Sequence, residues 1–247
     1  MAIRDVLGAM RWATISTISR REFTLPSSGP IVSFTFDDFP RSALTVGGAI
    51  LKTCGAYGTY YAALGLMNTI NDLGQHFLAE DLQTLVNAGH ELGSHTLNHL
   101  SCRTVSLPKF QADTTKGKQA VEQITGIRDS HHFSYPYGHA TLWAKPRIGT
   151  SVSSCRGIVP GINESPVDLN LLRANSLYSR SFDLDSIARL LKANTRCRGW
   201  LIFYTHDISE NPSPFGCKPN EFESAIKIAV KSGARVVPVG KAIAGDA

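Results

Sequence analysis

Two adjacent aspartates are the residues of this chain best placed to do chemistry. Asp37 and Asp38 end a run of apolar and β-branched residues that begins at Ile31 and is typical of a buried strand. Successive side chains of a strand point in opposite directions, so one carboxylate can ligate a metal while the other carries protons. The alternative is a turn, because aspartate and proline are common turn residues and Pro40 follows.

A pair of histidines, His95 and His99, complements the aspartates. In a helical turn, a spacing of four would place both imidazoles on one side, within reach of one cation. Imidazole and carboxylate ligands favour a divalent transition metal, with zinc first and cobalt, nickel or another divalent ion as alternatives. Three protein ligands would leave a position open for water, as catalysis requires. Two loop histidines without a metal are the alternative.

Strands and helices alternate along the chain, which predicts a parallel sheet. The candidate residues then lie at the carboxyl ends of strands, where α/β barrels and open α/β sheets place their sites. We expect strands at 31–36, 58–63, 90–94, 131–135, 151–157, 171–177, 199–205 and 234–238, and helices at 41–54, 76–88, 108–125, 140–148, 183–194 and 220–231.

Four segments resemble the motifs of the polysaccharide deacetylases, also called the NodB homology domain or carbohydrate esterase family four. They are Thr35-Phe-Asp-Asp38, the segment Gly89 to His99, Phe133-Ser-Tyr-Pro-Tyr-Gly138 and Leu201-Ile-Phe-Tyr-Thr-His206, in the order of the family. The resemblance implies an α/β fold, a single-domain distorted (β/α)7 barrel, with about one strand fewer than the eight-stranded type. We place this domain at 30–247, after a lead-in segment at 1–29.

The resemblance also implies an activity, the removal of acetyl groups from the N-acetylated or O-acetylated sugars of a poly- or oligosaccharide. Asp38, His95 and His99 would hold the metal. Water activated by the metal would attack the acetyl carbonyl, with Asp37 as the general base. His206 would be the general acid, because an imidazole can supply a proton to the departing amine near neutral pH.

Two further residues would contact the substrate, and a third position departs from the pattern of the family. By resemblance, the backbone N–H of Tyr137 would stabilise the carbonyl oxygen, and Leu201 would form a wall of the acetyl pocket. The third motif of the family begins with an arginine that orients the base, whereas this chain has Ser134. We expect Asp37 to titrate higher unless another cation substitutes, and Arg173 is our candidate.

The composition of the chain indicates which kinds of partner and which compartment to expect. The net charge is +5, and basic residues form no cluster interleaved with aromatics, so nucleic acid is not expected as a partner. No stretch approaches the roughly 18 apolar residues of a membrane span. Five cysteines without Cys-x-x-Cys spacing indicate a reducing compartment, so we expect the cytoplasm, with export as the alternative. The oligomeric state is not indicated.

Three other functions remain open at this point. One is the hydrolysis of another non-peptide C–N bond in a small molecule. The second is a glycan-binding module with impaired catalysis, suggested by Ser134 and by the lack of a clear fourth motif. The third is a non-haem iron oxygenase, because two histidines and one carboxylate also describe that site, although its usual scaffold does not alternate strands and helices.

Overall fold

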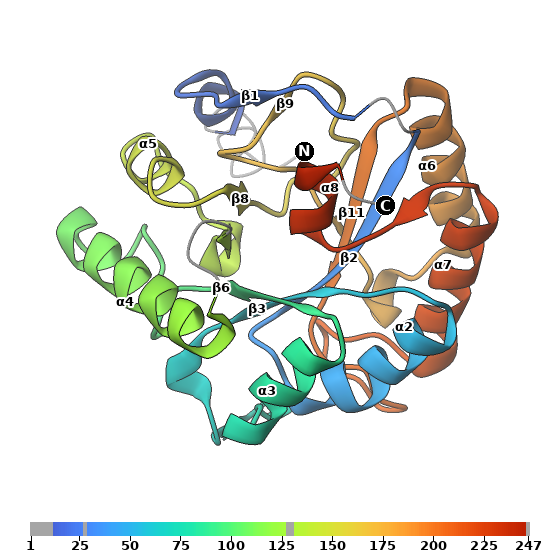
Figure 1. Cartoon of the computed structure of the whole chain (residues 1–247), viewed down its shortest axis with the longest axis horizontal. Coiled ribbons are helices and arrows are strands. Elements are labelled where there is room, and N and C mark those ends of the chain that lie inside the picture. The colour runs from blue at the N-terminus through green and yellow to red at the C-terminus, as the bar shows by residue number, and fades with distance from the viewer. Residues whose placement is uncertain (1–11, 27–28, 127–130, 246–247) are drawn as a thin grey trace.

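The computed structural model describes residues 12–26, 29–126 and 131–245, and its centre is one curled parallel sheet (Figure 1). Its strands are β2 (Ile31–Asp37), β3 (Thr59–Ala62), β6 (Glu91–Ser94), β7 (His132–Ser134), β8 (Ser154–Arg156), β10 (Asn175–Ser176), β11 (Trp200–Thr205) and β12 (Arg235–Val236). They pair in the order β10-β11-β2-β3-β6-β7-β8, with β12 beside β2, and every pairing is parallel. The structure confirms the α/β class and the distorted (β/α)7 barrel.

The segment between β8 and β11 brings the two edges of the sheet together. Leu172 N donates to Cys155 O at 2.8 Å, and Gly157 N donates to Leu172 O at 2.9 Å, so this part of the segment pairs with β8. Three residues later, Asn175 pairs with Phe203 of β11. The strand predicted at 171–177 is therefore reduced to the two residues of β10, because the first part of that range serves the neighbouring strand.

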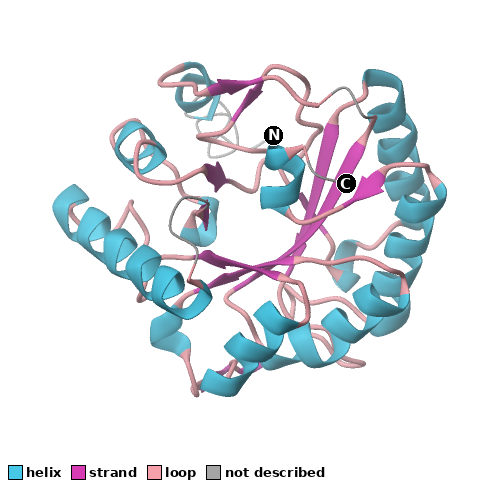
Figure 2. Cartoon of the chain, viewed as in Figure 1, coloured by secondary structure: helices cyan, strands magenta, loops and turns pink. Residues whose placement is uncertain are grey.

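Helices surround the sheet, as Figure 2 shows. The helices are α2 (Ala49–Thr53), which continues a π-helical turn at Ala43–Gly48, α3 (Ala79–Asn87), α4 (Leu107–Thr125), α5 (Ala144–Gly149), α6 (Leu184–Cys197), α7 (Pro219–Lys231) and α8 (Val239–Ala244). Two small antiparallel pairs, β1 (Glu22–Phe23) with β9 (Val167–Asp168) and β4 (Ile70–Asn71) with β5 (Gly74–Gln75), lie outside the main sheet. The predicted helices are present; α8 and these short pairs were not predicted, because each is too short to show a periodic pattern.

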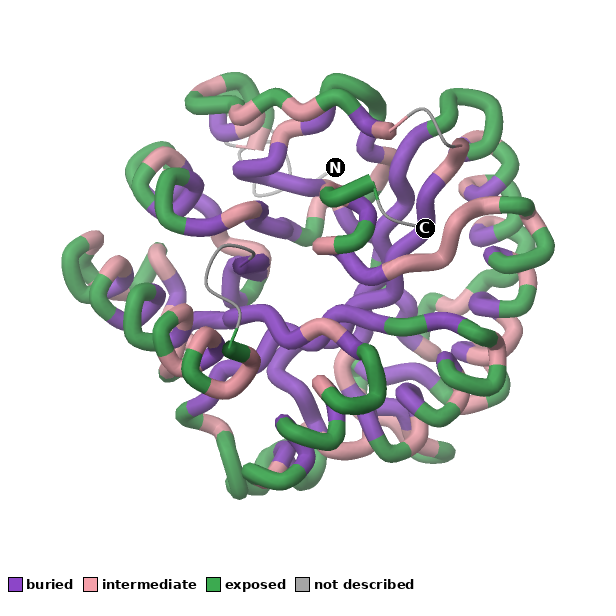
Figure 3. The backbone as a smooth tube through the Cα atoms, viewed as in Figure 1, coloured by how far each residue is buried: buried purple, intermediate pink, exposed green. Residues whose placement is uncertain are grey.

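Alternation along the central strands separates two parts of the core. Leu201 and Phe203 of β11 pack in a cluster with Phe222 of α7, outside the sheet. Trp200 and Ile202 pack in a different cluster, on the other face. Both faces of the strand are therefore buried, which is why its sequence is continuously apolar, and Figure 3 shows the buried strands inside more exposed helices.

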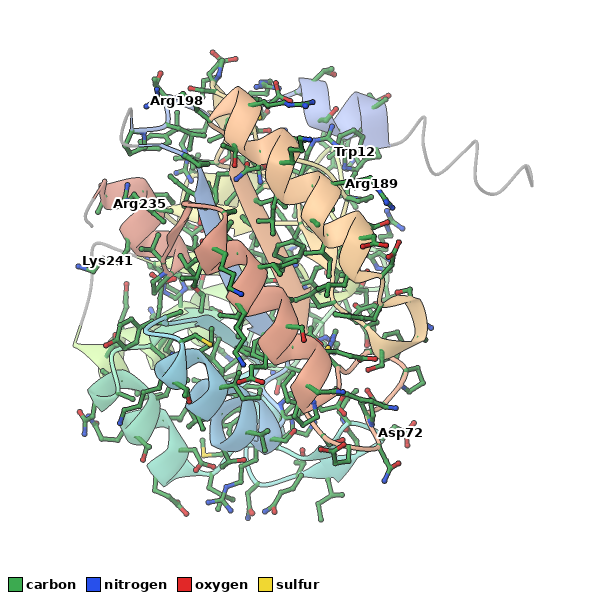
Figure 4. The ribbon with its side chains drawn as sticks, turned by 90° about the vertical axis from the view of Figure 1, so that its right-hand side faces the viewer. Trp12, Asp72, Arg189, Arg198, Arg235 and Lys241 are labelled. Carbon is green, nitrogen blue, oxygen red and sulfur yellow. The ribbon has the colours of Figure 1, made fainter. Side chains whose placement is uncertain are left out.

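The predicted positions at strand ends are confirmed. Asp37 is the last residue of β2 and Ser134 the last of β7, while His95 follows β6 and His206 follows β11. Parallel strands end on the same side, so these residues reach one end of the barrel. Figure 4 shows that end at Asp72 of the β4–β5 hairpin, opposite Arg198, which precedes β11.

The described chain begins with a helix over residues 12–17, and a buried lysine of the barrel binds the carbonyl groups of this segment. Lys145 Nζ donates to Ile15 O at 2.9 Å and to Ile18 O at 2.7 Å, and it lies 2.7 Å from Asp168 Oδ2. This helix belongs to the lead-in segment predicted at 1–29, of which residues 1–11, 27 and 28 lie outside the described residues. The boundary between 29 and 30 stays a prediction.

All five cysteines are free thiols. Among the residues that the structure describes, no helix has both the length and the apolar character needed to cross a membrane.

Replacing Lys145 tests whether its contacts with the N-terminal segment and Asp168 stabilise the fold. Lys145→Ala should lower the free energy of unfolding by about 3–5 kcal/mol, because it leaves the buried carboxylate of Asp168 without its cation. Lys192→Ala on the exposed face of α6 is the control and should change stability by less than about 0.5 kcal/mol. Urea denaturation measures both, and equal stability of the two variants would contradict a structural role for Lys145.

Candidate active site

A cavity of about 390 Å³ opens at the carboxyl end of the barrel. Six of the residues singled out in the sequence line it, namely Asp37, Asp38, His95, His99, Tyr137 and His206. The fold therefore gathers, from four separate strand ends, groups that lie far apart in the sequence.

Asp38, His95 and His99 form a compact cluster of ligand atoms. One atom from each residue lies within 4.8 Å of the others, and no second group of this kind occurs in the described part of the chain. Asp38 Oδ1 lies 3.4 Å from His95 Nε2 and 3.0 Å from His99 Nε2. A buried carboxylate oxygen that faces two imidazole nitrogens is the arrangement that a shared cation requires.

The protonation states also suit a cation. His95 Nδ1 lies 2.8 Å from Ser134 O and can donate only in the tautomer that leaves Nε2 free as a ligand atom. Burial lowers the pKa of His95 to about 4, so the ring is neutral at physiological pH. Burial raises the pKa of Asp38, but the hydrogen bond from His99 and the nearby imidazoles outweigh it, and the net pKa lies well below its usual range. A neutral imidazole at His95 and an ionised carboxylate at Asp38 are ligands that fit a divalent metal.

The two histidine ligands come from a loop, so the prediction of a helical turn between them is wrong. Thr96 has φ of 61° and His99 has φ of 53°, both in the left-handed region, where residues with a Cβ are strained. Asp38 and Tyr137, with φ of 61° and 59°, are strained in the same way. Such strain persists where the surrounding structure over-determines the backbone, and it concentrates at functional sites.

A carboxylate of α4 holds the histidine loop in place. Asp113 Oδ1 accepts hydrogen bonds from Leu97 N at 3.0 Å and Asn98 N at 2.9 Å. Gly117, one turn later, lets the helix approach closely, because a Cβ there would lie 2.7 Å from the carbonyl carbon of Thr96. The helix therefore fixes the loop backbone and, through it, the positions of both imidazoles.

Asp37 has a cationic partner, but it is Arg156 of β8 and not the predicted Arg173. Arg156 Nη2 donates to Asp37 Oδ1, and Ser134 Oγ lies 3.4 Å from the same oxygen. Burial would raise the pKa of Asp37, but Arg156 and nearby histidines outweigh it, so the net pKa is lowered. The rise expected without a substitute cation therefore does not occur.

The hypothesis for Arg173 is wrong because its side chain turns toward the N-terminal helix. Arg173 Nη1 donates to Pro160 O at 3.0 Å, and the guanidinium lies 4.3 Å from the ring of Trp12, which Figure 4 labels. Arg156 could have been found by the rule that found the aspartates, because it stands at the end of the strand predicted at 151–157.

His206 also lines the cavity, close to Asp38. Its Nδ1 lies 3.2 Å from Phe215 O, and its Nε2 lies 4.0 Å from Asp38 Oδ2. A hydrogen bond from Nδ1 to the carbonyl would leave Nε2 to exchange protons with a group in the cavity. Its side chain is only 14% exposed, so the ring is held at the site.

Of the two predicted substrate contacts, Tyr137 lines the cavity and Leu201 does not. Tyr137 is 57% exposed, and its ring centroid lies 4.6 Å from that of His99. Leu201 is fully buried on the outer face of β11, so its prediction as a wall of the acetyl pocket is wrong. Strand alternation gives the reason: Tyr204, three positions later, faces the cavity, and the sequence analysis missed it.

Part of the chain matches a known protein family. Residues 25–145 match the model of the family described as polysaccharide deacetylase, and they contain the cluster of Asp38, His95 and His99. The chain belongs to the polysaccharide deacetylase family. Where the resemblance implied an arginine, this chain has Ser134, and Arg156 lies beside Asp37 instead.

Solved structures share the fold of this polysaccharide deacetylase at low identity. The chitin deacetylase of Colletotrichum lindemuthianum has a TM-score of 0.59 at 18% identity, covering 91% of this chain and 92% of that one. A family 4 acetyl xylan esterase from Clostridium thermocellum, in complex with a cobalt ion, has a TM-score of 0.57 at 17% identity, with 88% and 93% covered. Bacillus subtilis PdaA, a family 4 carbohydrate esterase, has a TM-score of 0.57 at 11% identity, with 97% and 89% covered.

Asp113 provides a test of the histidine loop. Asp113→Ala should lower zinc affinity by about 10- to 100-fold, because the loop that carries both imidazoles loses its backbone contacts. The control is Glu122→Ala, which removes a carboxylate from the same helix, where it pairs with Lys118. Competition with a chromophoric chelator measures the affinity, and a folded Asp113→Ala variant with unchanged zinc binding would contradict the role of α4.

Proposed function

We propose that this protein is a metal-dependent hydrolase that removes acetyl groups from the N-acetylated or O-acetylated sugars of a poly- or oligosaccharide. The observation that carries the proposal is the meeting, in one cavity, of the Asp38, His95 and His99 cluster with Asp37 and His206. A metal cluster alone would fit a structural site, but a separate carboxylate and imidazole beside it provide for proton transfer.

Asp38, His95 and His99 would hold the divalent ion. When bound, such an ion polarises a carbonyl group and makes water a stronger acid. Asp37 then acts as the general base and takes the proton of the attacking water. It is suited to this task because it lines the cavity yet is not a member of the ligand cluster.

His206 and Tyr137 would assist the leaving group and the acetyl oxygen. His206 Nε2 faces the cavity and would protonate the departing amine or alcohol, since an amine leaves poorly without a proton. The backbone N–H of Tyr137 would donate to the acetyl oxygen as negative charge develops there. The exposed Tyr137 ring also offers an apolar face to a sugar.

The substrate class rests on the family and on the fold relatives, whose names include chitin and xylan as polymers. The choice among acetylated glycans depends on the loops around the cavity. The alternative of a glycan-binding module with impaired catalysis rested on the missing arginine and on the lack of a clear fourth motif. Arg156 weakens the first of these grounds by pairing with Asp37.

Acetate release tests the function directly. The protein is stripped of metal, reloaded with zinc or cobalt and incubated with an N-acetylglucosamine hexamer, acetylated xylan or peptidoglycan fragments. We expect acetate from at least one glycan, loss of the activity with chelator and recovery with metal. Acetate release that chelator leaves unchanged, or no release by the zinc-loaded protein from any of the three, would contradict the proposal.

A pair of variants separates the base from the ligands. Asp37→Asn should keep zinc affinity within a few-fold and lower kcat by about 100- to 10,000-fold, the usual contribution of a general base. His99→Ala should weaken zinc binding itself, since one of three ligands is lost. Metal content and kcat are measured on the same samples, and equal zinc loss in the two variants would show that the roles are misassigned.

A further inference from the structure

Arg156 is a fully buried cation at the end of β8. A guanidinium carries its charge at any physiological pH, so its burial is costly unless its N–H groups find acceptors. Nη2 donates to Asp37 Oδ1 and to Ser134 Oγ, the latter at 2.6 Å, and Nη1 donates to Gly157 O at 2.9 Å.

Aromatic rings restrict the same guanidinium. Its central carbon lies 5.1 Å from the ring centroid of Tyr61 and 4.9 Å from that of Tyr204. Both distances fall within the range in which a guanidinium is attracted to an aromatic face. Tyr204 lines the cavity, whereas Tyr61 is fully buried. The position of Arg156 is thus set by contacts on several sides.

The register of the sheet explains how an arginine of β8 reaches a carboxylate of β2. Ser134 and Arg156 are paired neighbours on the parallel strands β7 and β8. Paired residues on adjacent strands point to the same face, so the small side chain of Ser134 leaves room for the guanidinium above it. An arginine at position 134 would place its guanidinium in the same space from the adjacent strand β7.

We propose that Arg156 is the positioning residue for Asp37, so that a guanidinium supplied by β8 over Ser134 orients the base of the proposed reaction. This inference rests on the proposed function. Both contacts to Asp37 end on Oδ1, which leaves the second oxygen of a cavity-lining carboxylate to receive a proton. A lysine cannot replace this contact, because an ammonium group lacks the planar fork that reaches Asp37, Ser134 and Gly157 together.

The experiment that tests this proposal exchanges the paired residues Ser134 and Arg156. Arg156→Ser should lower kcat for acetate release from the N-acetylglucosamine hexamer, or from whichever glycan is active, by about 100-fold, as expected for a displaced catalytic group. KM and zinc affinity should change by less than about three-fold, because the metal ligands are untouched. The double variant Ser134→Arg/Arg156→Ser, which restores a guanidinium from β7, should recover at least a tenth of the lost kcat. Arg173→Ser is the matched control and should behave as the wild type.

Several outcomes would overturn the proposal. One is an Arg156→Ser variant with the kcat of the wild type, and another is a folded double variant no more active than Arg156→Ser. Loss of zinc binding in parallel with kcat would show a structural role instead. If Arg156→Ser does not fold, Arg156→Lys carries the test, and full kcat in that variant would refute positioning.

Crystal structures of the variants keep this inference separate from the proposed function. If the zinc-loaded wild type released acetate from no glycan, the proposed function would fail. Arg156 would then be judged by the side chain of Asp37, which should adopt another rotamer in Arg156→Ser and return to its original one in the double variant. An unmoved Asp37 in Arg156→Ser would refute the proposal whatever the activity.

Discussion

The buried pair of Asp37 and Arg156 is the interaction on which the arrangement of this site depends. Arg156 is fully buried and Asp37 is only 4% exposed, so each charge requires the other, and removing one would leave the other costly to bury. Asp37 faces the guanidinium, whereas the adjacent Asp38 faces the two histidines. Two neighbouring carboxylates thereby have different surroundings, one facing a cation of the protein and the other facing ligands for a metal.

The parallel barrel makes this division possible. Strands that run in one direction all end on one side, so short turns after β2, β6, β7, β8 and β11 bring distant residues together. The ends are also where the backbone is most strained, as at Asp38, Thr96 and His99. The regular part of the sheet supplies rigidity, and the cost of the strained conformations is met by contacts such as those of Asp113.

Sequence alone predicted the parallel fold, the strand ends and the gathering of the aspartates with the histidines, because alternation of elements and motif spacing are local features. The end of the strand predicted at 151–157 offered Arg156 as a candidate, but its pairing with Asp37 depends on the register of β7 and β8, which no local pattern specifies. The resemblance to the last motif wrongly indicated Leu201 as a wall of the acetyl pocket. Strand alternation counted from His206 would have favoured Tyr204 as the residue that faces the cavity. The helical turn at His95 was wrong because a contact with α4, distant in sequence, replaces helical bonds.

The central claim is that Asp38, His95 and His99 form one metal centre. Anomalous diffraction at the zinc absorption edge, from crystals of the zinc-loaded protein, tests it most directly. The account predicts a single strong peak in the cavity, bonded to a carboxylate oxygen of Asp38 and to the Nε2 atoms of both histidines. A cavity without a peak, or zinc held by other residues while these three side chains stay as they are, would contradict it.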